Sequence, residues 1–156
     1  MAEKTAAGAK FYIGPANDAA DDEAAYKILS YVEVGHVVDI PEFGITYQSV
    51  TSDQLGSRLT KMFKGQKSAG TPSIIYDHDA DDAGQEDIID ALASDSDYAF
   101  KITLDDAGPN SPSNPTTFYF RGKVMSAPIT IGTANNMVRR SVQIGINSVP
   151  VEVAAV

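Results

Sequence analysis

The chain has 156 residues, a net charge of −9 and no cysteine. This length suits one domain that buries a core without cross-links, and the absence of cysteine excludes disulfide bonds, thiolate catalysis and cysteine-ligated zinc. The acidic balance argues against tight nucleic-acid binding, which needs a basic surface. No apolar run approaches the ~18 residues of a membrane-spanning helix, and the N-terminus has no apolar signal region. We therefore expect a soluble protein made in the cytoplasm.

The first part of the chain predicts an arm followed by strands. Residues 1–24 are rich in Ala, Gly and Asp, which indicates an extended arm with at most a short strand at 10–13. Residues 27–40 are rich in β-branched side chains and predict a strand with a bend or bulge at Gly35. Apolar and polar residues then alternate over 43–50, which is typical of a further strand.

The segment 51–71 is predicted to be a long loop. It holds three glycines, and loops of this length are usually functional. The spacing of Leu55, Leu59, Met62 and Phe63 allows one short helical turn within it.

The second half of the chain predicts more strands and one helix. The helix is expected over 84–94, where Ile88, Ile89 and Leu92 form an apolar stripe. Strands are expected at 72–76, 98–104, 117–126, 129–131 and 138–153. Because strands outnumber helices and do not alternate with them, the sequence predicts a mainly β fold. We expect a two-sheet β-sandwich or partly closed barrel with one flanking α-helix, formed as a single domain by residues 25–156.

Charge is divided between two segments of the chain. Residues 77–97 contain nine acidic residues and no basic one, whereas residues 58–67 contain four basic residues and no acidic one. Opposite patches on one small chain favour contact between copies. Two separately solvated surfaces are the simpler alternative.

Motifs for catalysis and metal binding are incomplete. Asp77, Asp79 and Asp81 match the first ligand positions of an EF-hand loop, but Asp82 stands at its glycine position and Ile88 at its glutamate position. The chain has no nucleophile elbow and no phosphate-binding loop. Acidic residues are so abundant that a pair suited to glycoside hydrolysis carries no information. We expect no enzymatic activity, no metal and no cofactor.

Four further segments occur in a characteristic order around the basic stretch 59–67. They read VGHVVDIPEFG at 34–44, DIIDAL at 87–92, FYFRGKVMS at 118–126 and NNMVRRSVQI at 135–144. In order and spacing these segments resemble the lambda-type major tail tube proteins of long-tailed bacteriophages (siphoviruses). The resemblance covers about residues 25 to 150.

The resemblance implies a fold of two packed β-sheets flanked by one helix, related to the tube proteins of type VI secretion. It implies subunits that form hexameric rings stacked into the tail tube of a virion, with inner strands closing a barrel around a lumen. The expected partners are further copies of the chain, the tape measure protein in the lumen, and the tail terminator and tail tip proteins. DNA would pass without specific binding during genome ejection, and no membrane partner is expected. The C-terminal Ig-like domain of some tail tube proteins is not expected here.

Two assembly surfaces are predicted within this resemblance. Residues 51–71 would reach the next ring as an inter-ring loop, and the arm at 1–24 would become ordered between subunits. Small polar residues on strand faces suit a wet barrel interior, although an outer solvent face would look the same. The predicted inter-ring residues are Arg58, Lys61, Lys64, Lys67, Asp79, Asp81 and Asp82. The predicted lumen-facing residues are Thr130, Ser141, Gln143 and Asn147.

Two alternative functions remain open at this stage. One is a ring-forming secretion tube protein of the same fold. The other is a monomeric β-sandwich binding module, such as an adhesin or a carbohydrate-binding domain. Self-assembly into long particles would separate a tube subunit from a binding module.

Overall fold

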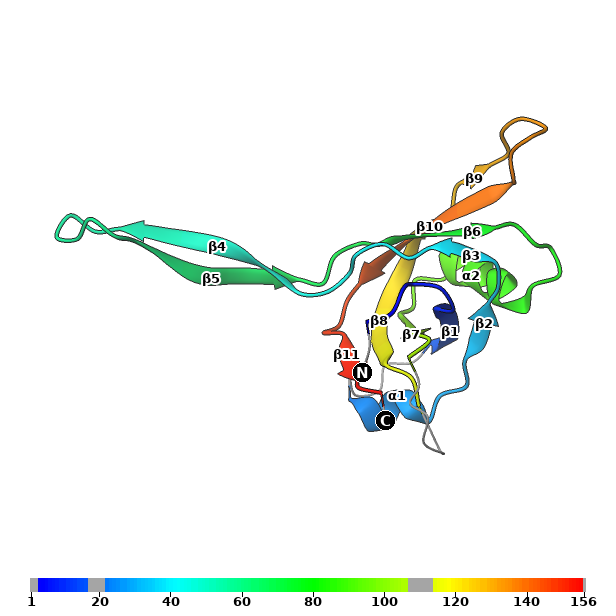
Figure 1. Cartoon of the computed structure of the whole chain (residues 1–156), viewed down its shortest axis with the longest axis horizontal. Helices are drawn as coiled ribbons and strands as arrows, with labels where there is room; N and C mark the ends of the chain where they lie inside the picture. Colours follow the sequence, from blue (N-terminus) through cyan, green and yellow to red (C-terminus); the bar gives the residue numbers. More distant parts are fainter. Residues whose placement is uncertain (1–2, 17–21, 107–113, 156) are drawn as a thin grey trace.

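The computed structural model describes residues 3–16, 22–106 and 114–155. Within these residues, one nine-stranded antiparallel sheet has the order β2-β1-β7-β8-β10-β6-β3, with β11 paired to β8 and β9 to β10. A separate two-stranded sheet consists of β4 and β5 (Figure 1). The strands are β1 Lys10–Ala16, β2 Val32–Val34, β3 Val37–Asp39, β4 Thr46–Asp53, β5 Thr60–Ser68, β6 Ser73–Asp77, β7 Tyr98–Thr103, β8 Thr117–Ser126, β9 Ile129–Thr130, β10 Arg139–Ile146 and β11 Val151–Val153.

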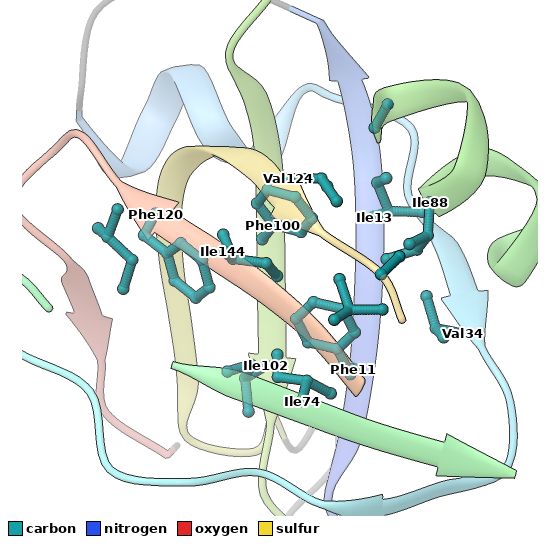
Figure 2. Close-up of a cluster of buried hydrophobic side chains, with 14 of the residues drawn as sticks. Phe11, Ile13, Val34, Ile74, Ile88, Phe100, Ile102, Phe120, Val124 and Ile144 are labelled. Carbon is teal, nitrogen blue, oxygen red and sulfur yellow. The ribbon is translucent and has the colours of Figure 1, made fainter. Parts of the chain in front are cut away.

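The nine-stranded sheet curls around the main core. Buried side chains from both halves of the sheet meet in one cluster, among them Phe11 of β1, Phe120 of β8 and Ile74 of β6 (Figure 2). The ring of Phe100 stacks between those of Phe11 and Phe120, with centroid separations of 5.7 and 5.5 Å. Burial of this apolar surface is the main source of the stability of the fold. The mainly β fold with a flanking helix is confirmed. The packed layers belong to one continuous sheet, whose ends β2 and β3 do not pair with each other in the described strands.

Helix α2 (Ala83–Ala93) covers one end of the core. Ile88 and Ala91 are buried in the main cluster, and the prediction of a helix over 84–94 is confirmed to within one residue at each end. Asp82 is its N-cap and accepts hydrogen bonds from the backbone N–H groups of Gly84 and Gln85. This capping explains why the helix begins directly after the acidic loop.

A second, short helix, α1 (Glu23–Lys27), lies against the other face of the sheet. Its buried Tyr26 stacks on Tyr119 of β8 at 5.5 Å. The predicted strand over 27–40 was therefore wrong at its start, because Asp22 caps a helical turn there. The predicted bend at Gly35 is confirmed: β2 and β3 are separated by Gly35 and by His36, whose φ is 62°.

Two other predicted segments differ in the structure. The short strand allowed at 10–13 is present as β1, but it continues to Ala16. It lies between β2 and β7, and Phe11 and Ile13 are buried, so this part of 1–24 is a core strand and not an extended arm. Alternation of these apolar residues outweighs the polar composition around them. Residues 1–2 and 17–21 of the predicted arm lie outside the described residues. The predicted strand over 138–153 is divided into β10 and β11, with Pro150, which lacks a backbone N–H, just before β11.

The predicted loop at 51–71 is mostly a β-hairpin. Strands β4 and β5 pair from Thr46 opposite Ser68 to Asp53 opposite Thr60. The short helical turn predicted around Met62 and Phe63 was wrong, since both residues lie on β5. The hairpin extends from the body of the molecule as a long arm (Figure 1).

Candidate functional site

The β4–β5 hairpin is the most unusual feature of the molecule. Its strands pair only with each other, and nearly all of their residues are exposed. A two-stranded ribbon on its own is marginally stable in water, and its outer edges carry backbone groups that can pair with another chain. Such an arm is suited to being covered by a partner.

Large apolar side chains lie on both faces of the hairpin. Cross-strand partners share a face of the ribbon, so Val50 and its partner Phe63 lie on one face, and Met62 lies with its partner Thr51 on the other. Phe63 is 55% exposed and Met62 is 70% exposed. The exposed large apolar residues of the hairpin and its tip are Tyr47, Val50, Leu55, Leu59, Met62 and Phe63. Apolar surface of this kind, gathered on one element, marks an interaction site.

The four predicted basic residues are distributed over the hairpin. Arg58 lies in the turn, and Lys61 shares a face with Phe63. Lys64 and Lys67 lie on the opposite face, where they pair with Ser49 and Tyr47, and the Lys64 ammonium is 4.8 Å from the centroid of the Tyr47 ring. Among the described residues, none of these four basic side chains forms an ion pair. Their charges are therefore available to an acidic partner.

The predicted acidic partners are only partly available. Asp79 lies 3.0 Å from the His36 ring Nε2 and accepts a hydrogen bond from the N–H of Asp81. The pKa of Asp79 is lowered, mainly by the hydrogen bond from the Asp81 N–H and to a smaller extent by His36. Asp82 holds the start of α2 and also accepts the N–H of Gly35 at 2.9 Å. Asp81 is exposed.

The role of Asp82 is testable by unfolding. Asp82→Ala leaves the N–H groups of Gly35, Gly84 and Gln85 without this acceptor. We expect a loss of about 2 kcal/mol in the free energy of unfolding, measured in urea. The exposed neighbour Asp81 is the matched control, and Asp81→Ala should change the free energy by less than about 0.5 kcal/mol. Equal effects of the two substitutions would contradict this role.

Two exposed carboxylates of the acidic segment 77–97 were not among the predicted site residues. Glu86 and Asp90 are exposed on α2, and among the described residues neither forms an ion pair. Their spacing of four residues places them on one side of the helix, a signal that the sequence already contained.

The hairpin lies at one end of the molecule, and the acidic end, formed by α2 and the loop before it, lies at the other. In Figure 1 the hairpin extends to the left, whereas α2 and the loop before it lie at the right. The two charged surfaces therefore do not meet within one copy. Opposite charges at opposite ends suit a head-to-tail contact between copies.

Three of the four predicted lumen-facing residues lie together on one sheet face. Ser141 and Gln143 alternate along β10 with the buried Val142 and Ile144. Thr130 pairs with Arg139 of β10 and so shares that face. The fourth residue, Asn147, follows β10 and donates to Asp97 Oδ1 at 3.0 Å.

Clusters of metal-ligating side chains and membrane-spanning helices are not found in the described part of the chain. No group of three or more His, Asp or Glu side chains in it is placed to hold a metal ion. Its helices are too short and too polar to cross a lipid bilayer.

The chain matches no family model, and it matches no curated protein. The solved structures that it resembles have the mainly β fold of tail tube proteins and of Hcp. One is the sheath/tube terminator of the extracellular contractile injection system PVC, with a TM-score of 0.70 and 11% identity over 99% of each chain. Another is the SPP1 tail tube protein, with a TM-score of 0.65 and 13% identity over 94% of this chain and 76% of that one. A third is an Hcp protein, with a TM-score of 0.50 and 12% identity over 94% of this chain and 98% of that one.

These likenesses establish the fold. They include a contractile injection system as well as the SPP1 tail tube, so the fold does not single out the long-tailed phage type that the sequence segments suggested.

Proposed function

We propose that this chain is a structural subunit that assembles with copies of itself into a tube. The observation that carries the proposal is the β4–β5 hairpin, a long arm with exposed apolar residues on both faces and no partner in the described chain. The fold shared with tube components supports it.

In its finer form the proposal is a phage tail tube. Subunits form hexameric rings, and the hairpin of one ring contacts the acidic end of a subunit in the next. Thr130, Ser141 and Gln143 are proposed to face the lumen, because they form a polar, uncovered face next to a buried one. A net charge of −9 limits adhesion of DNA passing through. The proposed partners are the tape measure protein in the lumen and the tail terminator and tail tip proteins at the tube ends, all within the virion tail.

A ring-forming secretion tube protein is the second candidate. Its supporting observation is the likeness to Hcp, which covers most of both chains. The two candidates differ in product: a tail tube grows as a long filament, whereas a secretion ring protein would be purified mainly as closed rings.

Negative-stain electron microscopy of the purified, concentrated protein tests the proposal. We expect hollow filaments or stacked rings, because the hairpin leaves apolar surface exposed until a second copy covers it. Sedimentation at increasing protein concentration should show a critical concentration, above which the monomer concentration stays constant. Compact monomers at every concentration would contradict the proposal and favour a binding module.

A further inference from the structure

A pocket of about 240 Å³ lies at the end of the molecule opposite the hairpin. It is formed by β6, β10, α2 and the loop before α2, and its wall includes Tyr76, His78, Asp79, Glu86, Ile89 and Arg140. Tyr76 is only 1% exposed. Its buried hydroxyl has no hydrogen-bond partner among the described residues. Buried polar groups in native proteins nearly always have a partner, either protein or ordered water, so this hydroxyl has hydrogen-bonding capacity left for a donor that enters the pocket.

The charge around the pocket favours a cation. Glu86 is exposed and forms no ion pair in the described residues, and Asp79 adds a second carboxylate to the wall, where its Oδ2 is also 3.0 Å from the His36 ring Nε2. Arg140 is the basic member of the wall and opposes these two carboxylates; its Nη1 donates to the carbonyl oxygen of Ala127 at 2.6 Å, which fixes the position of the guanidinium and leaves its charge in place. Burial raises the pKa of Tyr76, so its hydroxyl stays neutral and can accept a hydrogen bond from a cationic donor.

Two partly exposed apolar side chains lie beside the acidic wall of the pocket. Ile89 and Leu92 are 39% and 38% exposed on α2. Their spacing of three residues puts them next to each other on the helix surface. A partner that fits this end of the molecule therefore carries one cation flanked by apolar side chains.

The hairpin tip has this composition. The turn between β4 and β5 contains Arg58, which is exposed, together with the exposed Leu55 and Leu59. The turn is defined by a hydrogen bond from the N–H of Ser57 to the carbonyl oxygen of Gln54, and Thr60 donates to Asp53 at its base. Arginine is the cation best suited to the site, since the several N–H groups of its planar guanidinium can donate to a carboxylate and to a hydroxyl at the same time.

We propose that the Tyr76 pocket receives Arg58 from the hairpin tip of a second copy of this chain. This inference rests on the proposed head-to-tail assembly. The Arg58 guanidinium donates to Glu86 and to the Tyr76 hydroxyl, while Leu55 and Leu59 cover Ile89 and Leu92. The contact supplies the buried hydroxyl with a partner and removes apolar surface of both copies from water.

Cross-linking tests the contact directly, because the chain has no cysteine of its own. The double variant Ser57→Cys/Ala80→Cys places one thiol on the tip and one on the pocket wall while keeping Arg58 and Glu86. Under mild oxidation of assembled protein we expect disulfide-linked multimers to form roughly tenfold or more faster than in the control Ser57→Cys/Thr130→Cys. Thr130 is exposed but lies on a different face.

Charge exchange gives an independent readout. Arg58→Glu and Glu86→Arg should each raise the critical concentration for assembly several-fold, and the double variant should restore it. Asp95→Arg makes the same charge change as Glu86→Arg at an exposed position beyond α2 and should leave assembly unaltered. Filaments of the unmodified chain without the expected cross-link, or without rescue in the double variant, would overturn the pocket assignment and leave the tube proposal standing. Failure of the unmodified chain to assemble at all would instead overturn the tube proposal and, with it, this contact.

Discussion

Replacing Val50 and Phe63 with serine is expected to raise the critical concentration for the proposed tube assembly by at least about tenfold. Both residues lie on one face of the hairpin, and each is about half exposed in the single copy. Burial of their remaining apolar surface by a neighbour contributes roughly 2 kcal/mol, and about 1.4 kcal/mol corresponds to a tenfold change. Sedimentation of the assembled protein at a series of concentrations measures the effect.

Two comparisons show whether this effect belongs to the hairpin face. Ile28→Ser removes a large exposed apolar residue outside the hairpin and should leave the critical concentration nearly unchanged. Reversing the charges of Lys61, Lys64 and Lys67 should slow assembly mainly at low salt, because added salt screens exposed charges. The Val50/Phe63 effect should persist at high salt. An unchanged critical concentration in the serine variant would argue against burial of this face.

Gly84→Ala is expected to destabilise the single subunit by about 2–3 kcal/mol. Gly84 lies in the first turn of α2, which packs directly on the backbone of β2. A Cβ atom at this position would lie 2.2 Å from the carbonyl oxygen of Glu33. Since the obstacle is backbone, the helix has to move away from the sheet. Denaturant unfolding monitored by circular dichroism measures the loss.

Gly56→Ala is the matched control for this prediction. A Cβ atom at Gly56, in the hairpin turn, meets no other atom within 4 Å. The same chemical change should therefore alter the free energy of unfolding by less than about 1 kcal/mol, and with either sign. Similar losses of unfolding free energy at both glycines would mean that the close contact between α2 and β2 is not the reason why Gly84 cannot be replaced.

Local signals in the sequence were sufficient for several elements. The apolar stripe of Ile88, Ile89 and Leu92 located α2, and alternation located β7. These predictions succeed because periodicity reports directly which side of an element meets the core. The same reasoning missed β1 as a core strand and α1 as a helix, because in each case a few residues decide the outcome within a polar or ambiguous stretch.

The candidate site was predicted less completely. Its charged segments are visible in the sequence, which has four basic residues between 58 and 67 and nine acidic ones between 77 and 97. Alternation over 43–50 indicated the first part of β4, but the partner strand β5 was missed, since glycines at 56, 65 and 70 resemble a loop. Pairing of β4 with β5 is a contact between segments, and no short window of sequence encodes it.

The sequence by itself determined the mainly β character of the chain, the position of its flanking helix and the separation of opposite charges, because composition and periodicity are local properties. Only the tertiary structure decided where those charges lie. It engages Asp79 and Asp82 within the subunit, leaves Glu86 exposed on the wall of a pocket that the buried Tyr76 also lines, and places the hairpin at the far end of the molecule. The physical reason is that availability of a charge depends on its neighbours in space, and those neighbours come from strands and loops that are distant in the chain.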